Sequence, residues 1–272
     1  MPRLWVLLPC LNEEAALPGL LSPLRKLPTQ LREAEPPPAD IPEVRILVID
    51  DGSTDGTAGI AHRASEDATA QSECSIALLQ HAGNLGLGAA IRTGILRFIE
   101  RADESDWLAT MDGDGTQPPE LLVRMLREAH ERRLDVVIAS RYAGGGGEAG
   151  VSPSRRLYSR ICSRGLRMLF RIQGVRDYTC GFRVYSGKAL TRAHAQYGAS
   201  LIRERGFACQ AELLLHLACS GAVIGEVPLV LRYDEKRGAS KMRVLPTIWR
   251  YTVLTARELG SRRRQPTRGN RR

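Results

Sequence analysis

The chain has 272 residues, of which 43% are hydrophobic and 25% are charged. This balance excludes an intrinsically disordered chain and provides enough apolar residues for one large domain or two small ones. The formal net charge is +9, and six of the positive charges are arginines in the last eleven residues, so the rest of the chain is only mildly basic.

Six cysteines are scattered along the chain without any C-x-x-C pair. This spacing predicts reduced thiols in a cytoplasmic protein instead of a disulfide framework or a zinc site. The N-terminal apolar run is too short for a signal peptide, and no stretch reaches the ~20 apolar residues of a transmembrane helix. We therefore expect a cytoplasmic protein that is soluble or peripheral at the inner face of the membrane.

The first 140 residues alternate strand-like and helix-like segments. Strands are expected at 4–8, 44–50, 76–80, 106–111 and 135–140, and helices at 15–27, 57–68, 88–100 and 118–132. The proline-rich residues 28–43 are expected to be a surface excursion. Repeated strand–helix units with fully apolar strands predict an α/β fold with a mostly parallel sheet and helices on both faces.

Polar side chains follow the apolar core of four of these strands, at the point where each strand ends. They are Asn12 and Glu13, Asp50 and Asp51, Asp112 and Asp114, and Arg141. In parallel sheets, ligands bind beyond the carboxyl ends of the strands. The pattern therefore predicts an active site at this edge of the sheet.

The D-x-D segment Asp112-Gly113-Asp114 places two carboxylates one residue apart. Like charges so close cost free energy unless a positive charge lies between them. Carboxylate oxygens are ligands for Mg²⁺ or Mn²⁺, which also hold water and substrate phosphates. Since short acidic turns are also common on surfaces, it is the position at a strand end that favours a metal site.

Two glycine-containing turns lie beside this segment. Residues 84–88, NLGLG, open a helix, and they either cradle a phosphate or form a tight turn. Asp50 and Asp51 precede a turn in which Ser53, Thr54 or Asp55 is expected to cap the next helix. Two acids before the turn exceed what capping requires, so one of them could accept hydrogen bonds from a base or a ribose.

The second half of the chain is basic. Residues 143–150 are expected to be a mobile glycine loop, and residues 151–176 contain seven arginines and no acid. Arginines 156, 160, 164, 167 and 171 share one helical face, and Leu157, Ile161, Met168, Leu169 and Ile172 form a second. This pattern favours a phosphate- or membrane-facing helix over a merely solvated one. A helix near 207–221, a strand near 222–233 and a final helix at 244–259 follow.

Several of these segments, taken in order, carry a family resemblance. LPCLNEE, VIDDGSTDGT, NLGLGAAIRTG, MDGDG, ASRY, RRLYS, DYTCGFRVY, CQAELL and GEVPL followed by RGASKM resemble the family 2 glycosyltransferases. These have the GT-A fold, a Rossmann-like nucleotide-diphospho-sugar transferase fold. The dolichol- or polyprenyl-phosphate mannosyltransferase branch is the most similar. The resemblance implies a catalytic domain at 1–245, an amphipathic helix at 246–260 and a basic, disordered tail at 261–272.

The resemblance implies an inverting transfer of a sugar, mannose from GDP-mannose or glucose from UDP-glucose, to a polyprenyl or dolichyl phosphate. The residues that it assigns to the donor nucleotide-sugar are Pro9, Glu13, Asp50, Asp51, Gly86, Arg237 and Lys241. It assigns Mg²⁺ or Mn²⁺ to Asp112, Asp114 and Gln117, the acceptor phosphate to Arg155 and Ser159, and catalytic roles to Asp112, Asp114, Arg141 and Asp177.

The chain departs from the family pattern at three points. Leu11 stands in place of the usual tyrosine, and Thr116 stands where a glutamine often helps the metal, with Gln117 one residue further on. Transmembrane helices, common after the catalytic domain, are not expected here. The expected membrane contacts are therefore an anionic lipid surface and, as an alternative, a separate anchoring partner protein.

Three other functions compete with this one. A family 2 enzyme with a hydroxyl acceptor would need a base, and Asp177 is the candidate. A phosphate monoester is largely dianionic at neutral pH and needs none. A nucleic-acid-binding module would explain the arginines, but aromatic residues for base stacking make up only 5% of the chain. A catalytically inactive scaffold would not need both acids of the D-x-D segment.

Overall fold

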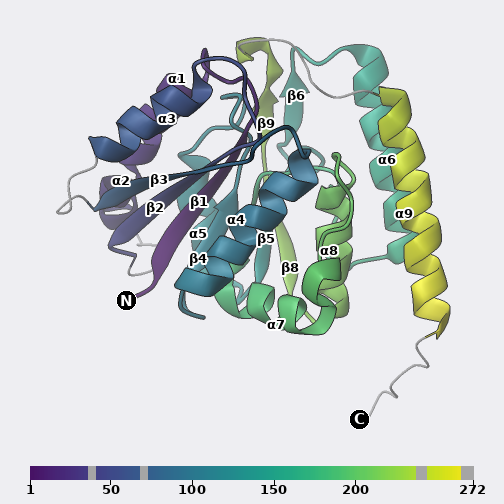
Figure 1. Ribbon diagram of the computed structural model, residues 1–272. Helices are drawn as coiled ribbons and strands as arrows, with labels where there is room; N and C mark the ends of the chain where they lie inside the picture. Colours follow the sequence, from purple (N-terminus) through teal and green to yellow (C-terminus); the bar gives the residue numbers. More distant parts are fainter. Residues whose placement is uncertain (36–40, 68–72, 237–243, 265–272) are drawn as a thin grey trace.

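The computed structural model describes residues 1–35, 41–67, 73–236 and 244–264. Its centre is a seven-stranded sheet with the strand order β3-β2-β1-β4-β7-β5-β8, and β6 pairs with β9 in a small second sheet (Figure 1). The strands are β1 (Arg3–Cys10), β2 (Glu43–Asp50), β3 (Cys74–Gln80), β4 (Trp107–Thr110), β5 (Val136–Ser140), β6 (Gly147–Ala149), β7 (Arg183–Ser186), β8 (Ile224–Pro228) and β9 (Val230–Arg232).

The helices alternate with the strands in the first half of the chain and are more frequent in the second. They are α1 (Leu17–Arg25), α2 (Leu27–Glu33), α3 (Thr57–Glu66), α4 (Leu87–Arg101), α5 (Leu121–Glu131), α6 (Pro153–Phe170), α7 (Gly187–Tyr197), α8 (Cys209–Cys219) and α9 (Val244–Arg264), with 3-10 turns at Gly198–Ser200 and Tyr233–Glu235.

The expected α/β fold with a mostly parallel sheet is confirmed. Strands β1 to β4 are parallel to one another, β5 is parallel to β8, and only β7 runs antiparallel, between β4 and β5. Cys10 pairs with Asp50, and Leu7 pairs with Thr110. The carboxyl ends of β1, β2 and β4 therefore meet at one edge, which brings the polar residues after them together.

Helices cover the sheet on both faces. Helix α4 contacts α7 and α8 on one side, while α1 contacts α3 and α2 contacts α5 on the other (Figure 1). The close fit of α4 needs Gly94, because a Cβ there would lie 2.2 Å from Leu7 Cδ1 on β1. Leu4 and Leu8 of β1 are likewise fully buried, as the apolar run predicted.

Several expected segments differ from the structure. The helix expected at 15–27 is two helices, and α2 extends into the proline-rich stretch because Pro28 lies in its first turn, where a proline removes no helical hydrogen bond. Residues 36–40 lie outside the described part. The glycine loop expected at 143–150 contains β6, which pairs with β9. Strand β7 and helix α7 were not expected.

Helices α6 and α9 lie side by side at the edge of the molecule, away from the central sheet (Figure 1). The apolar face expected on α6 does not pack inside, since Leu157 is 60%, Ile161 is 59% and Met168 is 74% exposed. Helix α9 continues to Arg264, five residues beyond the expected end, so residues 261–264 of the tail expected to be disordered are helical. Residues 265–272 lie outside the described part.

Candidate active site

A cavity of about 700 Å³ opens at the carboxyl edge of the sheet and reaches α6 and α9. Ten of the predicted site residues line it: Pro9, Glu13, Asp51, Gly86, Asp112, Asp114, Gln117, Arg141, Arg155 and Ser159. Asp50 and Asp177 are buried beside it and do not line it. The predicted residues Arg237 and Lys241 lie outside the described part of the chain.

The two acids that end β2 organise the loops of the cavity wall. Asp51 accepts the backbone N–H of Leu85 at 3.0 Å and of Gly86 at 2.8 Å, and it contacts His81 Nδ1 at 2.7 Å. The carboxylate of Asp50 accepts the N–H of Ser53 at 3.1 Å. Of the two, Asp51 is the one that reaches the cavity.

The NLGLG segment is a packed turn. Gly86 has φ +94°, and a Cβ there would lie 2.6 Å from the carbonyl oxygen of Arg205. The Gly88 N–H donates to that same carbonyl at 2.8 Å, and a Cβ on Gly88 would lie 1.7 Å from the Glu204 carbonyl oxygen. The amides of Leu85, Gly86 and Gly88 thus have protein acceptors, which favours the tight-turn interpretation over a phosphate cradle.

The D-x-D carboxylates follow β4 and are held by their own turn. The Gln117 side chain donates to Asp112 Oδ2 at 2.8 Å and accepts the Asp112 N–H at 2.9 Å. Asp114 Oδ1 accepts the Thr116 hydroxyl at 2.7 Å and its N–H at 3.1 Å. Gln117, expected as a metal ligand, therefore positions Asp112, and Thr116 positions Asp114.

A lysine pairs with one of these two acids. Lys236 Nζ pairs with Asp114 Oδ2, and both side chains are about nine-tenths buried. Burial raises the pKa of Asp112 to about 7, with the Asp114 charge adding to the rise and Lys236 opposing it. Lys236 thus offsets only part of the repulsion between the carboxylates of Asp112 and Asp114, an arrangement that favours a further cation.

Arg141, after β5, is fixed by Asp177. Its Nε and Nη2 donate to the two oxygens of Asp177 at 2.8 and 2.7 Å, and Nη2 also donates to Thr179. Burial works against the charged form of Asp177, but the Arg141 charge outweighs it and holds the pKa below its usual range. Asp177 is fully buried, so it positions Arg141 and offers no free base to the cavity.

The α6 end of the cavity carries Arg155 and Ser159, one helical turn apart. Arg155 Nη1 donates to the Tyr233 hydroxyl at 2.5 Å, and its guanidinium lies 4.7 Å from that ring's centroid. Ser159 accepts the Tyr142 hydroxyl at 2.8 Å. Lys236 lies 5.5 Å from the same Tyr233 ring, so Tyr233 connects the α6 cation to the D-x-D end.

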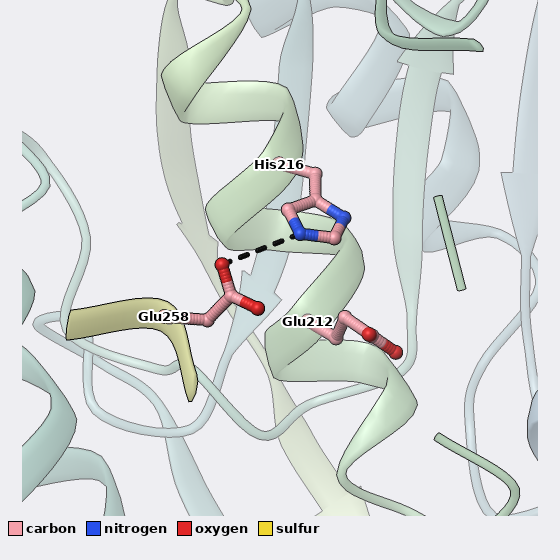
Figure 2. A group of neighbouring side chains, drawn as sticks. All are labelled: Glu212, His216 and Glu258. Atoms are coloured by element: carbon pink, nitrogen blue, oxygen red, sulfur yellow. Dashed lines mark ion pairs between the residues drawn. The ribbon is translucent and has the colours of Figure 1, made fainter. Parts of the chain in front are cut away.

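A second group of polar side chains joins α8 to α9 outside the cavity lining. Glu212, His216 and Glu258 lie close enough together to hold a metal ion (Figure 2). His216 Nδ1 donates to the Leu201 carbonyl at 2.9 Å, and Nε2 lies 3.4 Å from Glu258. Arg257 contacts both glutamates, so an arginine already supplies the cation here.

The cavity-lining residues that sequence reasoning missed include Lys236, Tyr233 and Glu148. Glu148 pairs with Arg141 at 3.2 Å from within β6, the segment expected to be mobile. Lys236 immediately precedes the RGASK segment, so its place in the sequence could have indicated that it belongs to the site. All six cysteines are free, as expected, but Cys162 is only half-buried and Cys219 is exposed.

The chain matches the family model described as "Glycosyl transferase family 2" over residues 5–192. It is 32% identical over 241 residues to the undecaprenyl-phosphate mannosyltransferase of Micrococcus luteus, covering 88% of this chain and 87% of the relative. It is 30% identical to the polyprenol monophosphomannose synthase of Mycolicibacterium smegmatis, covering 88% of this chain and 81% of the relative.

The fold has solved counterparts. Glucosyl-3-phosphoglycerate synthase from Mycobacterium tuberculosis, in complex with Mn²⁺, UDP and phosphoglyceric acid, matches 98% of this chain and 81% of its own with a TM-score of 0.58 and 20% identity. S. aureus TarS 1–349 in complex with UDP matches 94% of this chain and 65% of its own with a TM-score of 0.54 and 16% identity. The chain therefore belongs to glycosyl transferase family 2 and has the GT-A fold.

Proposed function

We propose that this family 2 glycosyltransferase transfers a hexose from a nucleotide-sugar to a polyprenyl phosphate. The hexose would be mannose from GDP-mannose or glucose from UDP-glucose. One observation carries the proposal: a single cavity has acids at the sheet end and a cation at the α6 end. The relatives, an undecaprenyl-phosphate mannosyltransferase and a polyprenol monophosphomannose synthase, support the same acceptor.

The acidic end fits a divalent cation with a diphosphate. Asp112 and Asp114 are neighbouring carboxylates: burial and then the Asp114 charge raise the pKa of Asp112, and a lysine ammonium pairs with Asp114. Such an oxygen donor set suits Mg²⁺ or Mn²⁺. A divalent cation bound there would supply charge to stabilise the departing diphosphate.

The cationic end fits the acceptor phosphate. Arg155 and Ser159 both face the cavity from α6. In the transfer, a phosphate oxygen forms a bond to the anomeric carbon while the bond from that carbon to the diphosphate oxygen breaks. The nucleoside diphosphate leaves with the electron pair. Since the attacking phosphate is largely dianionic, no side chain has to remove a proton.

The same geometry disfavours a hydroxyl acceptor. That chemistry needs a general base within reach of the nucleophile. Asp177 was the candidate, but it is fully buried, it does not line the cavity, and both of its oxygens accept hydrogen bonds from Arg141. A phosphate acceptor, which needs charge stabilisation and no base, agrees better with these contacts.

We also propose that the α6/α9 pair contacts an anionic membrane surface, where a polyprenyl phosphate resides. Within the described ranges, no helix combines the length and apolar character needed to cross a bilayer. The exposed apolar residues of this pair are Leu157, Ile161, Met168, Leu169, Ile248 and Trp249. Exposed Arg160 and Arg164 flank the α6 residues, a pattern typical of helices that lie in the membrane interface.

The test is a panel assay. Purified full-length protein is given GDP-mannose, UDP-glucose or UDP-galactose, Mn²⁺ or Mg²⁺, and a short-chain polyprenyl phosphate in detergent. The matched control acceptor is the same polyprenol without its phosphate. We expect a glycolipid product with the phosphate acceptor alone and with one preferred donor. Equal transfer to the free polyprenol, or none to the phosphate with any donor, would overturn the proposal.

A further inference from the structure

A second hollow, of about 660 Å³, lies at the C-terminal end of α6 and shares no lining residue with the active-site cavity. Four arginines from three parts of the chain line it: Arg132 after α5, Arg167 and Arg171 at the end of α6, and Arg176 before the buried Asp177. We propose that this hollow is a binding site for a phosphate-bearing anion.

The charges of the hollow are poorly balanced. Among the described residues, Arg167, Arg171 and Arg176 have no ion pair with a carboxylate, whereas Arg156, on the same helix, pairs with Glu148. Arg132 pairs with Glu128 at 3.3 Å on the exposed side of α5. Like charges gathered in one hollow favour an anion, and guanidinium groups suit the paired oxygens of a phosphate.

The one acid in the lining does not neutralise these arginines. Glu226 Oε1 accepts the backbone N–H of Arg176 at 2.6 Å and of Asp177 at 2.7 Å. Burial raises the pKa of Glu226. The helix dipoles favour Arg167 and Arg171 at the end of α6 and Arg132 at the end of α5, but they do not account for Arg176.

Arg171 gives the sharpest indication that the charge matters. It ends α6 with φ +47° and ψ +45°, which is the left-handed region of the backbone. Glycine adopts this conformation without strain and is the usual residue where a helix ends in it. An arginine at this position places a positive charge at the hollow although the backbone conformation favours glycine. Replacement by glycine would therefore relieve strain and remove charge at once.

The ligand could be a lipid headgroup or a free phosphate compound. Exposed Met168 lies between Arg167 and the end of α6, and the apolar row of that helix continues through Ile161 to Leu157. A lipid headgroup in the hollow would place its acyl chains beside this row. A soluble phosphate ester would use the same guanidinium contacts and would not contact this apolar row.

The test compares Arg171→Gly with Arg133→Gly. Arg133 is the matched control because it is an exposed arginine, also has a left-handed backbone with φ +51°, and does not line the hollow. Both variants should keep or raise the melting temperature. Two arms follow: calorimetry with inorganic pyrophosphate in EDTA, and flotation with phosphatidylcholine vesicles that do or do not contain phosphatidylglycerol.

We expect Arg171→Gly to weaken binding about tenfold or more in at least one arm, since a charge-assisted contact is lost, while Arg133→Gly matches the wild type. Loss in the vesicle arm alone identifies a lipid headgroup, and loss of one pyrophosphate per chain identifies a soluble phosphate. Unchanged binding in both arms, or equal losses in both variants, overturns the site. Transfer to a detergent-solubilised acceptor should be unchanged in Arg171→Gly, so this result is independent of the proposed activity.

Discussion

Asp114 provides the most direct test of the proposed metal site, because it pairs with Lys236 and would also hold the cation. In Asp114→Asn, one carboxylate charge is lost while the shape and the contacts to Thr116 are largely kept. We expect transfer to fall roughly a hundredfold or more, since a bound cation contributes several kcal/mol to transition-state stabilisation. The melting temperature in EDTA should change little. Near wild-type turnover, or activity that survives EDTA, would contradict the metal assignment.

Lys236 provides a separate test of the same site. Its ammonium pairs with Asp114 and therefore competes with a divalent cation. Lys236→Met should raise the affinity for Mn²⁺ without donor about tenfold, a modest part of a buried ion pair's interaction. Calorimetry with MnCl₂ measures the change. The control is Lys188→Met, at an exposed lysine of α7. An unchanged or weaker affinity would show that Lys236 does not compete for the acids.

Arg155 tests the acceptor end. Arg155→Ala removes a charge-assisted contact worth about 1.5–3 kcal/mol, so transfer should fall at least tenfold. The loss should be in the KM for the polyprenyl phosphate, with donor hydrolysis in the absence of acceptor unchanged. Arg155→Lys keeps the charge and should recover part of the rate. Weaker donor binding with unchanged acceptor affinity would assign Arg155 to the donor end.

At the scale of elements, Arg257 supplies the polar contacts that attach α9 to α8, in addition to the buried Tyr251 and Leu254. Arg257 donates to Glu212 at 2.5 Å and to Glu204 at 3.1 Å, and both glutamates are buried. Glu204 also belongs to the segment that packs on Gly88 beside the cavity. Arg257→Met should lower the free energy of unfolding by about 3 kcal/mol, because it leaves a buried carboxylate without its partner. Urea titration measures the loss.

The loss in Arg257→Met should depend on pH. Burial raises the pKa of Glu212 in the folded protein, and removing Arg257 raises it further. A carboxyl whose folded pKa lies above its unfolded value favours folding when protonated, and this contribution is lost as the pH rises through the folded pKa. The deficit should therefore shrink as the pH falls from about 8 towards 5. Arg250→Met, a 54% exposed arginine 3.9 Å from Glu204, is the control and should cost little.

The elements that the sequence predicted are those with a clear local pattern. The apolar strands β1, β2 and β5 and the polar residues after them were predicted because their periodicity and position are local properties. Strand β7 was missed because it has only four residues and begins with Arg183, which is fully buried with its guanidinium donating to two backbone carbonyls. The pairing of Lys236 with Asp114 joins residues 122 positions apart, and only the folded topology reveals it.

At the scale of the whole molecule, the cavity connects two different surroundings. One end lies at the sheet edge among the acids, and the other reaches Tyr158 of α6 and Tyr251 of α9. A water-soluble donor and a membrane-bound acceptor would enter such a cavity from opposite ends. The helix pair would then have to lie against the lipid, with its apolar residues in the interface and its arginines near the headgroups.

This arrangement predicts how the whole protein binds vesicles. Each basic residue near an anionic surface contributes roughly 1 kcal/mol, and salt screens the contribution. We therefore expect flotation with vesicles that contain phosphatidylglycerol, weaker binding as salt is raised, and little binding to phosphatidylcholine alone. Truncation after Leu259 should weaken binding and leave transfer to a detergent-solubilised acceptor intact, because the residues assigned to the transfer precede that point.

The apolar part of the contact needs its own variant. Ile161→Ser removes an exposed side chain that contributes little to the core, so the fold should survive while insertion into the interface weakens. Val223→Ser, at a position 53% exposed in the turn between α8 and β8, is the matched control for a lost apolar group elsewhere on the surface. If the two variants float equally well with anionic vesicles, the apolar residues of α6 do not insert into the interface. If the wild type binds neutral and anionic vesicles alike, the helix pair is not an electrostatic membrane anchor. A separate membrane-spanning partner protein would then be needed to bring the enzyme to its acceptor.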